Sequence, residues 1–136
     1  MTWDDARERC LQQGGDLAIV DSELKRQIIS SYLSVIDYLL PDVNIQAFIG
    51  IRKSSRWQWL GGANILANIW HFGYPQVLKS GKCGALVWDS LEWKLLQTSC
   101  FSTLHYMCET YESKYFCVSV MYMYNFFVFN VLYCDT

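Results

Sequence analysis

Six cysteines constrain this chain more than any other feature of its sequence. They stand at positions 10, 83, 100, 108, 117 and 134, and none of them forms a Cys-x-x-Cys pair. Zinc and redox-active sites usually have that spacing, and only His71 and His105 are present to complete a mixed metal site. Disulfides are therefore the better interpretation, and they imply a secretory route. The spacing alone does not say which cysteines are paired.

Length and composition predict one folded domain. The chain has 136 residues, of which 52% are hydrophobic and 16% aromatic, enough for a sizeable core and unlike a disordered chain. Its net charge is −2 and its eleven Lys and Arg residues are scattered, so no basic stripe is present to bind nucleic acid. We expect no nucleic-acid partner.

The start of the chain does not look like a signal peptide. Met1 is followed directly by the acidic, amphipathic segment TWDDARERC, which has neither a basic start nor an apolar core. We therefore expect that the signal for export lies outside this chain and that the chain is a fragment.

Two amphipathic helices are predicted near the start. Thr2 and the acidic pair at 4–5 are typical of a helix start, and Gly14 and Gly15 are typical of its end. Asp21 and Ser22 can cap a second helix, which Pro41 bounds. The first helix is expected to bury Trp3, Ala6 and Cys10, and the second to bury Leu24, Ile28, Tyr32 and either Val35 or Ile36.

Short apolar runs predict strands in the rest of the chain up to residue 108. The runs are Ala47–Ile51, Arg56–Gly62, Ala85–Trp88, Glu92–Leu96 and Leu104–Cys108. Residues 64–80 carry Asn, Gly and Pro and predict a long loop between them. Two helices followed by strands around a loop form an α+β order. The tryptophans expected in the core are Trp57, Trp59, Trp88 and Trp93.

The segment Tyr115–Cys134 has no charged residue in twenty positions. That length is enough to span a bilayer, so a membrane segment is one interpretation. Aromatic and β-branched residues dominate it, however, and two Asn interrupt it, which favours an apolar tail that packs as strand. A third interpretation is that residues 110–136 are an artefact of a truncated gene model.

Taken in order, these motifs resemble the C-type lectin-like domain family. TWDDARERCLQQGGDLAIVDS is similar to that family's first helix, AFIGI to its Trp-Ile-Gly-Leu signature, and RWQWLGG to the Trp-x-Trp-x-Gly that follows. Cys108 and Glu109 end the frame, so the resemblance covers residues 1–109. It implies an α+β, C-type lectin-like fold with two helices, short antiparallel strands around a long loop, and two disulfides.

The resemblance also implies the disulfide pairing. It pairs Cys10 with Cys108 and Cys83 with Cys100, and it leaves Cys117 and Cys134 without counterparts. These two are free, paired with each other, or linked to another chain. Because family members carry one or two strands before the first helix, we expect this chain to begin inside the domain.

Many members of the family bind sugars through calcium, and the loop motif for this is altered here. The family uses Glu-Pro-Asn or Gln-Pro-Asp on the long loop, and NIWHFGYPQ at 68–76 is similar to that segment. Trp70 and Pro75 match, but Tyr74 stands where the acidic or amide residue belongs, and Gln76 is one methylene longer than Asn. The resemblance allows Pro75 to follow a cis peptide bond.

The second calcium motif of the family, Trp-Asn-Asp, is altered as well. Trp93 is followed by Lys94 and Leu95, and residues 61–88 contain no Asp or Glu. Calcium takes six to eight oxygen ligands, mostly from carboxylates, and only Asp89 and Glu92 stand nearby as weak candidates. We expect no cofactor and no functional calcium site.

The ligand-binding candidates lie on the long loop. For the aromatic residues the alternative is that Trp70 folds back into the loop's own core, and for the lysines it is a solvated surface. Arg52 and Lys53 are candidates for a positive rim beside those lysines. The candidates are Trp70, His71, Tyr74, Gln76, Lys79 and Lys82.

The function expected is non-catalytic recognition of a protein or glycan outside the cell or at its surface, without calcium. One alternative is a calcium-dependent carbohydrate-binding lectin, and another is an incomplete fragment without binding activity. An enzyme is not expected, because neither histidine has a nucleophile and an orienting group near it in sequence.

Overall fold

We describe the chain from a computed structural model, which covers residues 1–39, 41–42, 44–65, 69–70, 74–76, 80–89, 92–112, 115–124 and 127–134. Side chains are described as far as Thr110, apart from Asp89, and only the backbone is described beyond it. The elements are α1 (Trp3–Gln12), β1 (Asp16–Leu17), α2 (Glu23–Leu39), β2 (Gln46–Lys53), β3 (Trp57–Trp59), β4 (Cys83–Asp89), β5 (Glu92–Thr98), β6 (His105–Glu112), β7 (Tyr115–Tyr124) and β8 (Phe127–Cys134).

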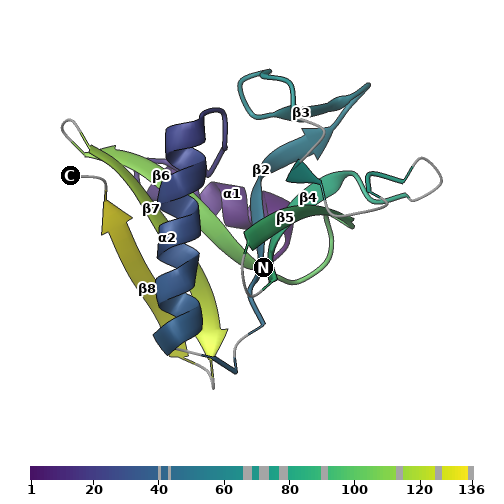
Figure 1. Cartoon of the computed structure of the whole chain (residues 1–136). Helices are drawn as coiled ribbons and strands as arrows, with labels where there is room; N and C mark the ends of the chain where they lie inside the picture. Colours follow the sequence, from purple (N-terminus) through teal and green to yellow (C-terminus); the bar gives the residue numbers. More distant parts are fainter. Residues whose placement is uncertain are drawn as a thin grey trace.

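One mixed sheet forms the centre of the fold. Its main path runs β5-β4-β2-β6-β7-β8, with β1 paired to β6 and β3 paired to β2. Figure 1 shows α2 in front of the β6–β8 side of this sheet and α1 behind it. The α+β class is thus confirmed. The strands were expected to be antiparallel, but β2 and β6 are parallel, because the chain leaves β5 and returns to the opposite side of β2.

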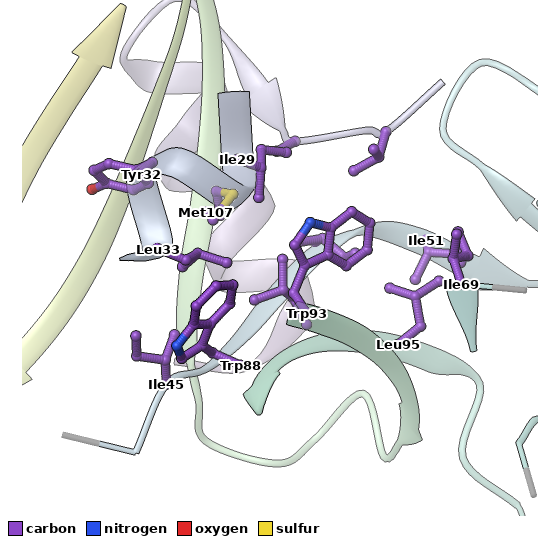
Figure 2. Close-up of a cluster of buried hydrophobic side chains, with 14 of the residues drawn as sticks. Ile29, Tyr32, Leu33, Ile45, Ile51, Ile69, Trp88, Trp93, Leu95 and Met107 are labelled. Atoms are coloured by element: carbon purple, nitrogen blue, oxygen red, sulfur yellow. The ribbon is translucent and has the colours of Figure 1, made fainter. Parts of the chain in front are cut away.

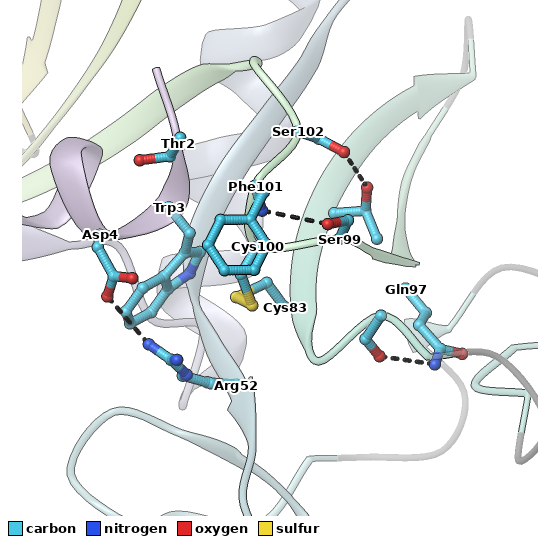
Figure 3. Close-up of a disulfide and its surroundings, with 12 residues drawn as sticks. Thr2, Trp3, Asp4, Arg52, Cys83, Gln97, Ser99, Cys100, Phe101 and Ser102 are labelled. Carbon is cyan, nitrogen blue, oxygen red and sulfur yellow. Dashed lines mark hydrogen bonds and ion pairs between the residues drawn. A yellow bond between two sulfur atoms is a disulfide. The ribbon is translucent and has the colours of Figure 1, made fainter.

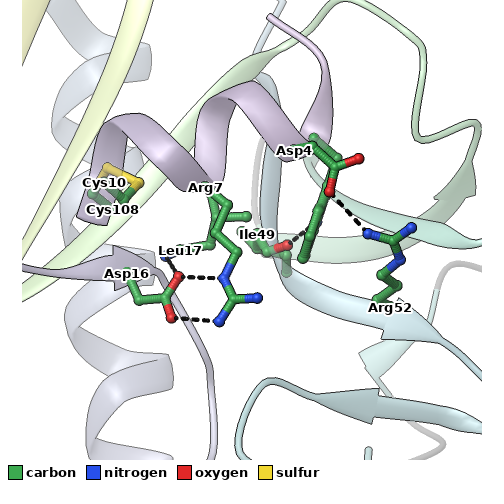
Figure 4. Close-up of polar contacts among 9 residues, drawn as sticks. Asp4, Arg7, Cys10, Asp16, Leu17, Ile49, Arg52 and Cys108 are labelled. Carbon is green, nitrogen blue, oxygen red and sulfur yellow. Dashed lines mark hydrogen bonds and ion pairs between the residues drawn. A yellow bond between two sulfur atoms is a disulfide. The ribbon is translucent and has the colours of Figure 1, made fainter. Parts of the chain in front are cut away.

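The first helix forms as its sequence predicts. Thr2 is its N-cap and its Oγ1 accepts a hydrogen bond from the amide of Asp5, while Gly14 takes a positive φ of 84° just after the helix ends. Trp3 is buried, and its indole Nε1 donates to the carbonyl oxygen of Ile49, 2.9 Å away. Arg7 also holds the carboxylate of Asp16 with two nitrogen–oxygen contacts of 3.1 and 3.2 Å (Figure 4). Helix α1 is therefore fixed to both β1 and β2.

The second helix buries a face that differs from the predicted one at Leu24. That side chain is 58% exposed, whereas Lys25 takes the corresponding place on the buried face, four residues before Ile29. The Lys25 ammonium lies 3.1 Å from Oε2 of the buried Glu109 on β6, and the Lys25 side chain is only 12% exposed. Val35 is also exposed, and Ile36 is the buried member of that pair. The buried residues of α2 are Ile28, Ile29, Tyr32, Leu33 and Ile36.

Two hydrophobic clusters lie on opposite faces of the sheet. The one that contains the buried residues of α2 is called the α2 cluster, and the one that contains Trp3, Ala6 and Cys10 of α1 is called the α1 cluster. Successive strand residues face opposite sides, and so Met107 belongs to the α2 cluster while Cys108 belongs to the α1 cluster. Figure 2 shows Ile29 and Leu33 of α2 gathered with side chains from β2, β4, β5 and β6. Each fully buried large apolar side chain contributes roughly 1.5–3 kcal/mol. Trp59, Trp88 and Trp93 are buried here as predicted, and Trp57 is partly buried against the same cluster.

Both predicted disulfides are present. Cys10 of α1 is bonded to Cys108 of β6, and Cys83 of β4 is bonded to Cys100 (Figures 3 and 4). Their sequence separations are 98 and 17 residues. By the loop-entropy relation, closing loops of these sizes stabilises the fold by about 4.7 and about 3.1 kcal/mol respectively. The first bond therefore encloses nearly the whole domain.

The uncharged segment at the C-terminal end consists of two strands. β7 pairs antiparallel with β6, and β8 pairs antiparallel with β7 from Tyr124↔Phe127 to Cys117↔Cys134. These strands extend the sheet, with β8 last in its order. No helix in the part of the chain that the structure describes has the length and apolar content needed to cross a bilayer.

Candidate functional site

The long loop is fixed to β5 at its first half. The backbone of Trp70 forms an isolated bridge with Leu95 of β5, and its ring meets that of Trp57 edge-on, with centroids 5.1 Å apart. Trp70 is only 9% exposed and belongs to the α2 cluster. Trp70 is therefore packed in the core, which was the alternative to a ligand-binding role, and its ring offers a ligand little surface.

The second half of the loop is fixed by Gln97, which the sequence analysis did not single out. This side chain is 7% exposed, and its Oε1 accepts a hydrogen bond of 2.8 Å from the amide of Gln76. Its Nε2 donates to the carbonyl oxygen of Gly81 at 2.7 Å (Figure 3). One buried amide therefore joins the two ends of the segment 76–81. We call this pair of bonds the Gln97 clamp.

A signal for the clamp is present in the sequence. Along β5, Trp93, Leu95 and Gln97 occupy alternating positions, and all three are buried. An amide at the third position of an otherwise apolar face has to be hydrogen-bonded inside the protein. The strand predicted from the sequence ended at Leu96, and extending its alternating pattern by one residue identifies Gln97 as buried.

The surface that the clamp supports consists of Tyr74–Gln76 and Ser80–Lys82, and we call it the long-loop surface. Pro75, Gln76 and Lys82 are exposed, and the Tyr74–Pro75 peptide bond is cis, as the resemblance allowed. Tyr74 is half-buried against the α2 cluster. Beside this surface lies an open pocket of about 290 Å³ lined by Ser80, Gly81, Gln97, Thr98 and Ser99. Hydroxyl and amide groups of uncharged residues thus dominate its lining.

Not all of the residues predicted to bind a ligand or to form a positive rim lie at this surface. His71 and Lys79 lie outside the described residues. Arg52, expected in a positive rim, instead has its Nη1 3.0 Å from Oδ1 of Asp4 and its guanidinium 5.0 Å from the centre of the Trp3 ring (Figure 4). Its charge is therefore engaged with α1, and Lys82 is the described lysine of the candidate set.

The described residues at the family's calcium position do not fit that ion. Glu92 is exposed and its carboxylate lies 3.8 Å from the ammonium of Lys94, while Leu95 is fully buried. The Asp89 side chain lies outside the described part. Among the described residues, no three His, Cys, Asp or Glu side chains come together as a metal-binding group. A donor set of one exposed carboxylate beside an ammonium is far from the six to eight oxygens that calcium takes.

Two side chains with shifted pKa values lie on β6, away from the long loop. Burial lowers the pKa of His105, and the nearby N-terminal ammonium lowers it further. Burial also raises the pKa of Glu109, while the ammonium of Lys25 opposes that change. Glu109 connects β6 to α2, and its role is therefore structural.

Comparisons with known proteins agree with this architecture. The family model described as the lectin C-type domain matches residues 1–110. The mouse protein C-type lectin domain family 6 member A is 23% identical over an alignment of 113 residues that covers 79% of this chain and 50% of that protein. This chain thus spans half the length of that relative.

Solved structures show the same fold. Human lithostathine superposes with a TM-score of 0.62 at 22% identity, covering 82% of this chain and 85% of that one. The C-type lectin domain of murine dendritic cell inhibitory receptor 2, solved in complex with an N-glycan, gives a TM-score of 0.51 at 20% identity, with 73% of each chain covered. With the family model matching most of its length, this chain belongs to the C-type lectin domain family.

Proposed function

We propose that this chain is a non-catalytic, extracellular recognition domain that binds a protein or a glycan through the long-loop surface without calcium. Two disulfides that close the domain support an oxidising, extracellular setting. The observation that carries the proposal is the Gln97 clamp, which holds Gln76 and Gly81 by neutral hydrogen bonds. These bonds join Gln76 and Gly81 without a metal ion.

The chemistry of the long-loop surface supports a polar, metal-free ligand site. Gln76 exposes an amide, Lys82 is an exposed cation, and the adjoining pocket is lined by the hydroxyl groups of Ser80, Thr98 and Ser99. Hydroxyl and amide groups form hydrogen bonds equally well with sugar hydroxyls and with peptide groups. The N-glycan bound by one structural neighbour supports including glycans among the candidate ligands.

Catalysis finds no support among the described residues. The lowered pKa of His105 follows from its burial on β6 and from the nearby N-terminal ammonium. A general base needs a substrate within hydrogen-bond reach, and the long-loop surface lies on the other side of β2 in the sheet order.

A calcium titration followed by thermal unfolding tests the metal-free part of the proposal. We expect the same melting temperature in calcium and in EGTA, because a ligand stabilises a fold only when it binds the folded state. A rise of several degrees that EGTA reverses would mean that the domain holds calcium.

Binding itself is tested on an immobilised glycan array and on a panel of recombinant extracellular proteins, each probed in EGTA. We expect binding in EGTA that Tyr74→Ala and Gln76→Ala weaken. Tyr38→Ala and Gln27→Ala are matched controls, because both residues are exposed on α2. Binding that requires calcium contradicts the proposal, and so does an absence of binding on both arrays.

A further inference from the structure

The pairing of β7 with β8 brings two cysteines to directly opposed positions. Cys117 of β7 is the register partner of Cys134 of β8, and neither takes part in the two disulfides already described. Directly opposed residues of an antiparallel pair lie on the same face of a sheet. The question is whether the backbone at this pair allows a bond between them.

The alternation of hydrogen bonds along the hairpin answers it. Two residues connect the strands, and the pair that flanks such a connection, here Tyr124↔Phe127, is ordinarily hydrogen-bonded. Hydrogen-bonded and non-hydrogen-bonded pairs alternate from there, so Cys117↔Cys134, which is an odd number of steps away, falls in the non-hydrogen-bonded class. In that class the two Cα atoms are about 4.5 Å apart, within the span of roughly 4.4–6.8 Å that a disulfide bridges.

The neighbouring hairpin leads to the same assignment independently. Glu112↔Tyr115 flanks the two-residue connection between β6 and β7, so Thr110↔Cys117, two residues further along, is a hydrogen-bonded pair. The backbone groups of Cys117 are then directed to β6 and not to β8. Both hairpins therefore place Cys117↔Cys134 in the class of pairs whose Cα atoms approach most closely.

We propose that Cys117 and Cys134 form a third disulfide that ties β8 to β7. The bond joins residues 17 apart (134 − 117), the same separation as Cys83 and Cys100. Because β8 is the last strand in the sheet order, a covalent bond across this pair holds it in register with β7.

The oxidation is an ordinary thiol–disulfide exchange. The thiolate of one cysteine attacks a sulfur of a donor disulfide, and oxidised glutathione or a dithiol oxidoreductase is a suitable donor. The second thiolate then displaces the donor's remaining thiol from the mixed disulfide. The two cysteines lose two protons and two electrons, and the donor leaves as two thiols.

Peptide mapping of the full chain, refolded with reduced and oxidised glutathione, tests the proposal. Free thiols are alkylated first, and trypsin then releases residues 115–136 as one peptide, because no Lys or Arg follows Lys114. We expect this peptide to be monomeric, unalkylated, and lighter than its reduced form by the mass of two hydrogen atoms. Chymotryptic cleavage between the cysteines should leave two fragments that separate only on reduction.

The other outcomes each overturn the inference. Alkylation of both cysteines before reduction shows free thiols, and a link from this peptide to another, or to a second copy, shows a different pairing. Cys117→Ser provides a matched check, since it should leave one additional thiol per chain, at Cys134, that reacts with the alkylating reagent. If it exposes none, Cys134 is not the partner of Cys117.

Discussion

Replacing Lys25 with methionine should destabilise the fold by about 3–5 kcal/mol at neutral pH, the usual cost of leaving one charge of a buried ion pair unpaired. The side chains of Lys25 and Glu109 are only 12% and 10% exposed, and their charged atoms are 3.1 Å apart. Methionine keeps most of the aliphatic stem, so the loss arises mainly from the charge. The second partner of Lys25, Asp21, is 40% exposed and adds little.

The stability lost in Lys25→Met should become smaller as the pH is lowered. Burial raises the pKa of Glu109 above its ordinary value of 4.5, so the folded state binds a proton more readily than the unfolded state. The contribution of Glu109 to stability is therefore greatest in acid, and it falls as pH rises from about 4.5 through the raised pKa. Removing Lys25 raises that pKa further, and protonated Glu109 no longer needs the cation.

Urea unfolding followed by tryptophan fluorescence, at acid and at neutral pH, measures both effects. Asp4→Asn is the matched control, because Asp4 and Arg52 are also 3.0 Å apart but are 66% and 46% exposed. Its cost should be about 1 kcal/mol or less. Equal losses of stability for the two variants would refute the argument that burial of an ion pair determines its contribution to stability. A Lys25→Met loss that does not change with pH would refute it as well.

Four further variants have clear expected outcomes. Gln97→Met should lower the free energy of unfolding by roughly 1–3 kcal/mol, because it removes both bonds of the Gln97 clamp, and hydrogen exchange at the Gln76 amide should become faster. Cys10→Ala/Cys108→Ala should cost about 4.7 kcal/mol and Cys83→Ala/Cys100→Ala about 3.1, and urea unfolding that gives the reverse order would contradict the loop-size argument. Gly15→Ala should destabilise the fold by roughly 1–3 kcal/mol in the same assay, because a Cβ there would overlap the carbonyl oxygen of Glu109.

The sequence predicted the parts of the fold that depend on local pattern. Helix α1 follows from its cap at Thr2 and its apolar spacing, and the strands from short apolar runs between turns. The disulfide pairing came from the resemblance, since spacing alone is silent on it. The helix and the strands could be predicted because each is encoded in one contiguous segment, and the disulfides because the motifs resemble those of a known family.

What could not be predicted depends on contacts between distant segments. The buried place of Lys25 follows from Glu109, which is 84 residues away (109 − 25), and the parallel pairing of β2 with β6 follows from the path of the chain after β5. The candidate site on the long loop stays a prediction, and the side chain that bonds Gln76 and Gly81 stands outside it, on β5. The alternation along β5 marks Gln97 as a buried amide, but its hydrogen-bond partners, Gln76 and Gly81, lie on a distant segment that this pattern does not identify.

The Gln97 clamp also shows how Gln76 and Gly81 are held together without the family's calcium-binding residues. In a calcium site, an ion draws loop carboxylates together and its charge balances theirs. Here residues 61–88 contain no carboxylate to balance, and a single neutral amide, held in the buried face of β5, joins Gln76 to Gly81. Because these hydrogen bonds join neutral groups, the link between Gln76 and Gly81 should not depend on metal or ionic strength. Any recognition at the long-loop surface then rests on Gln76, Tyr74 and Lys82 themselves, so substitutions there should alter ligand binding without unfolding the loop.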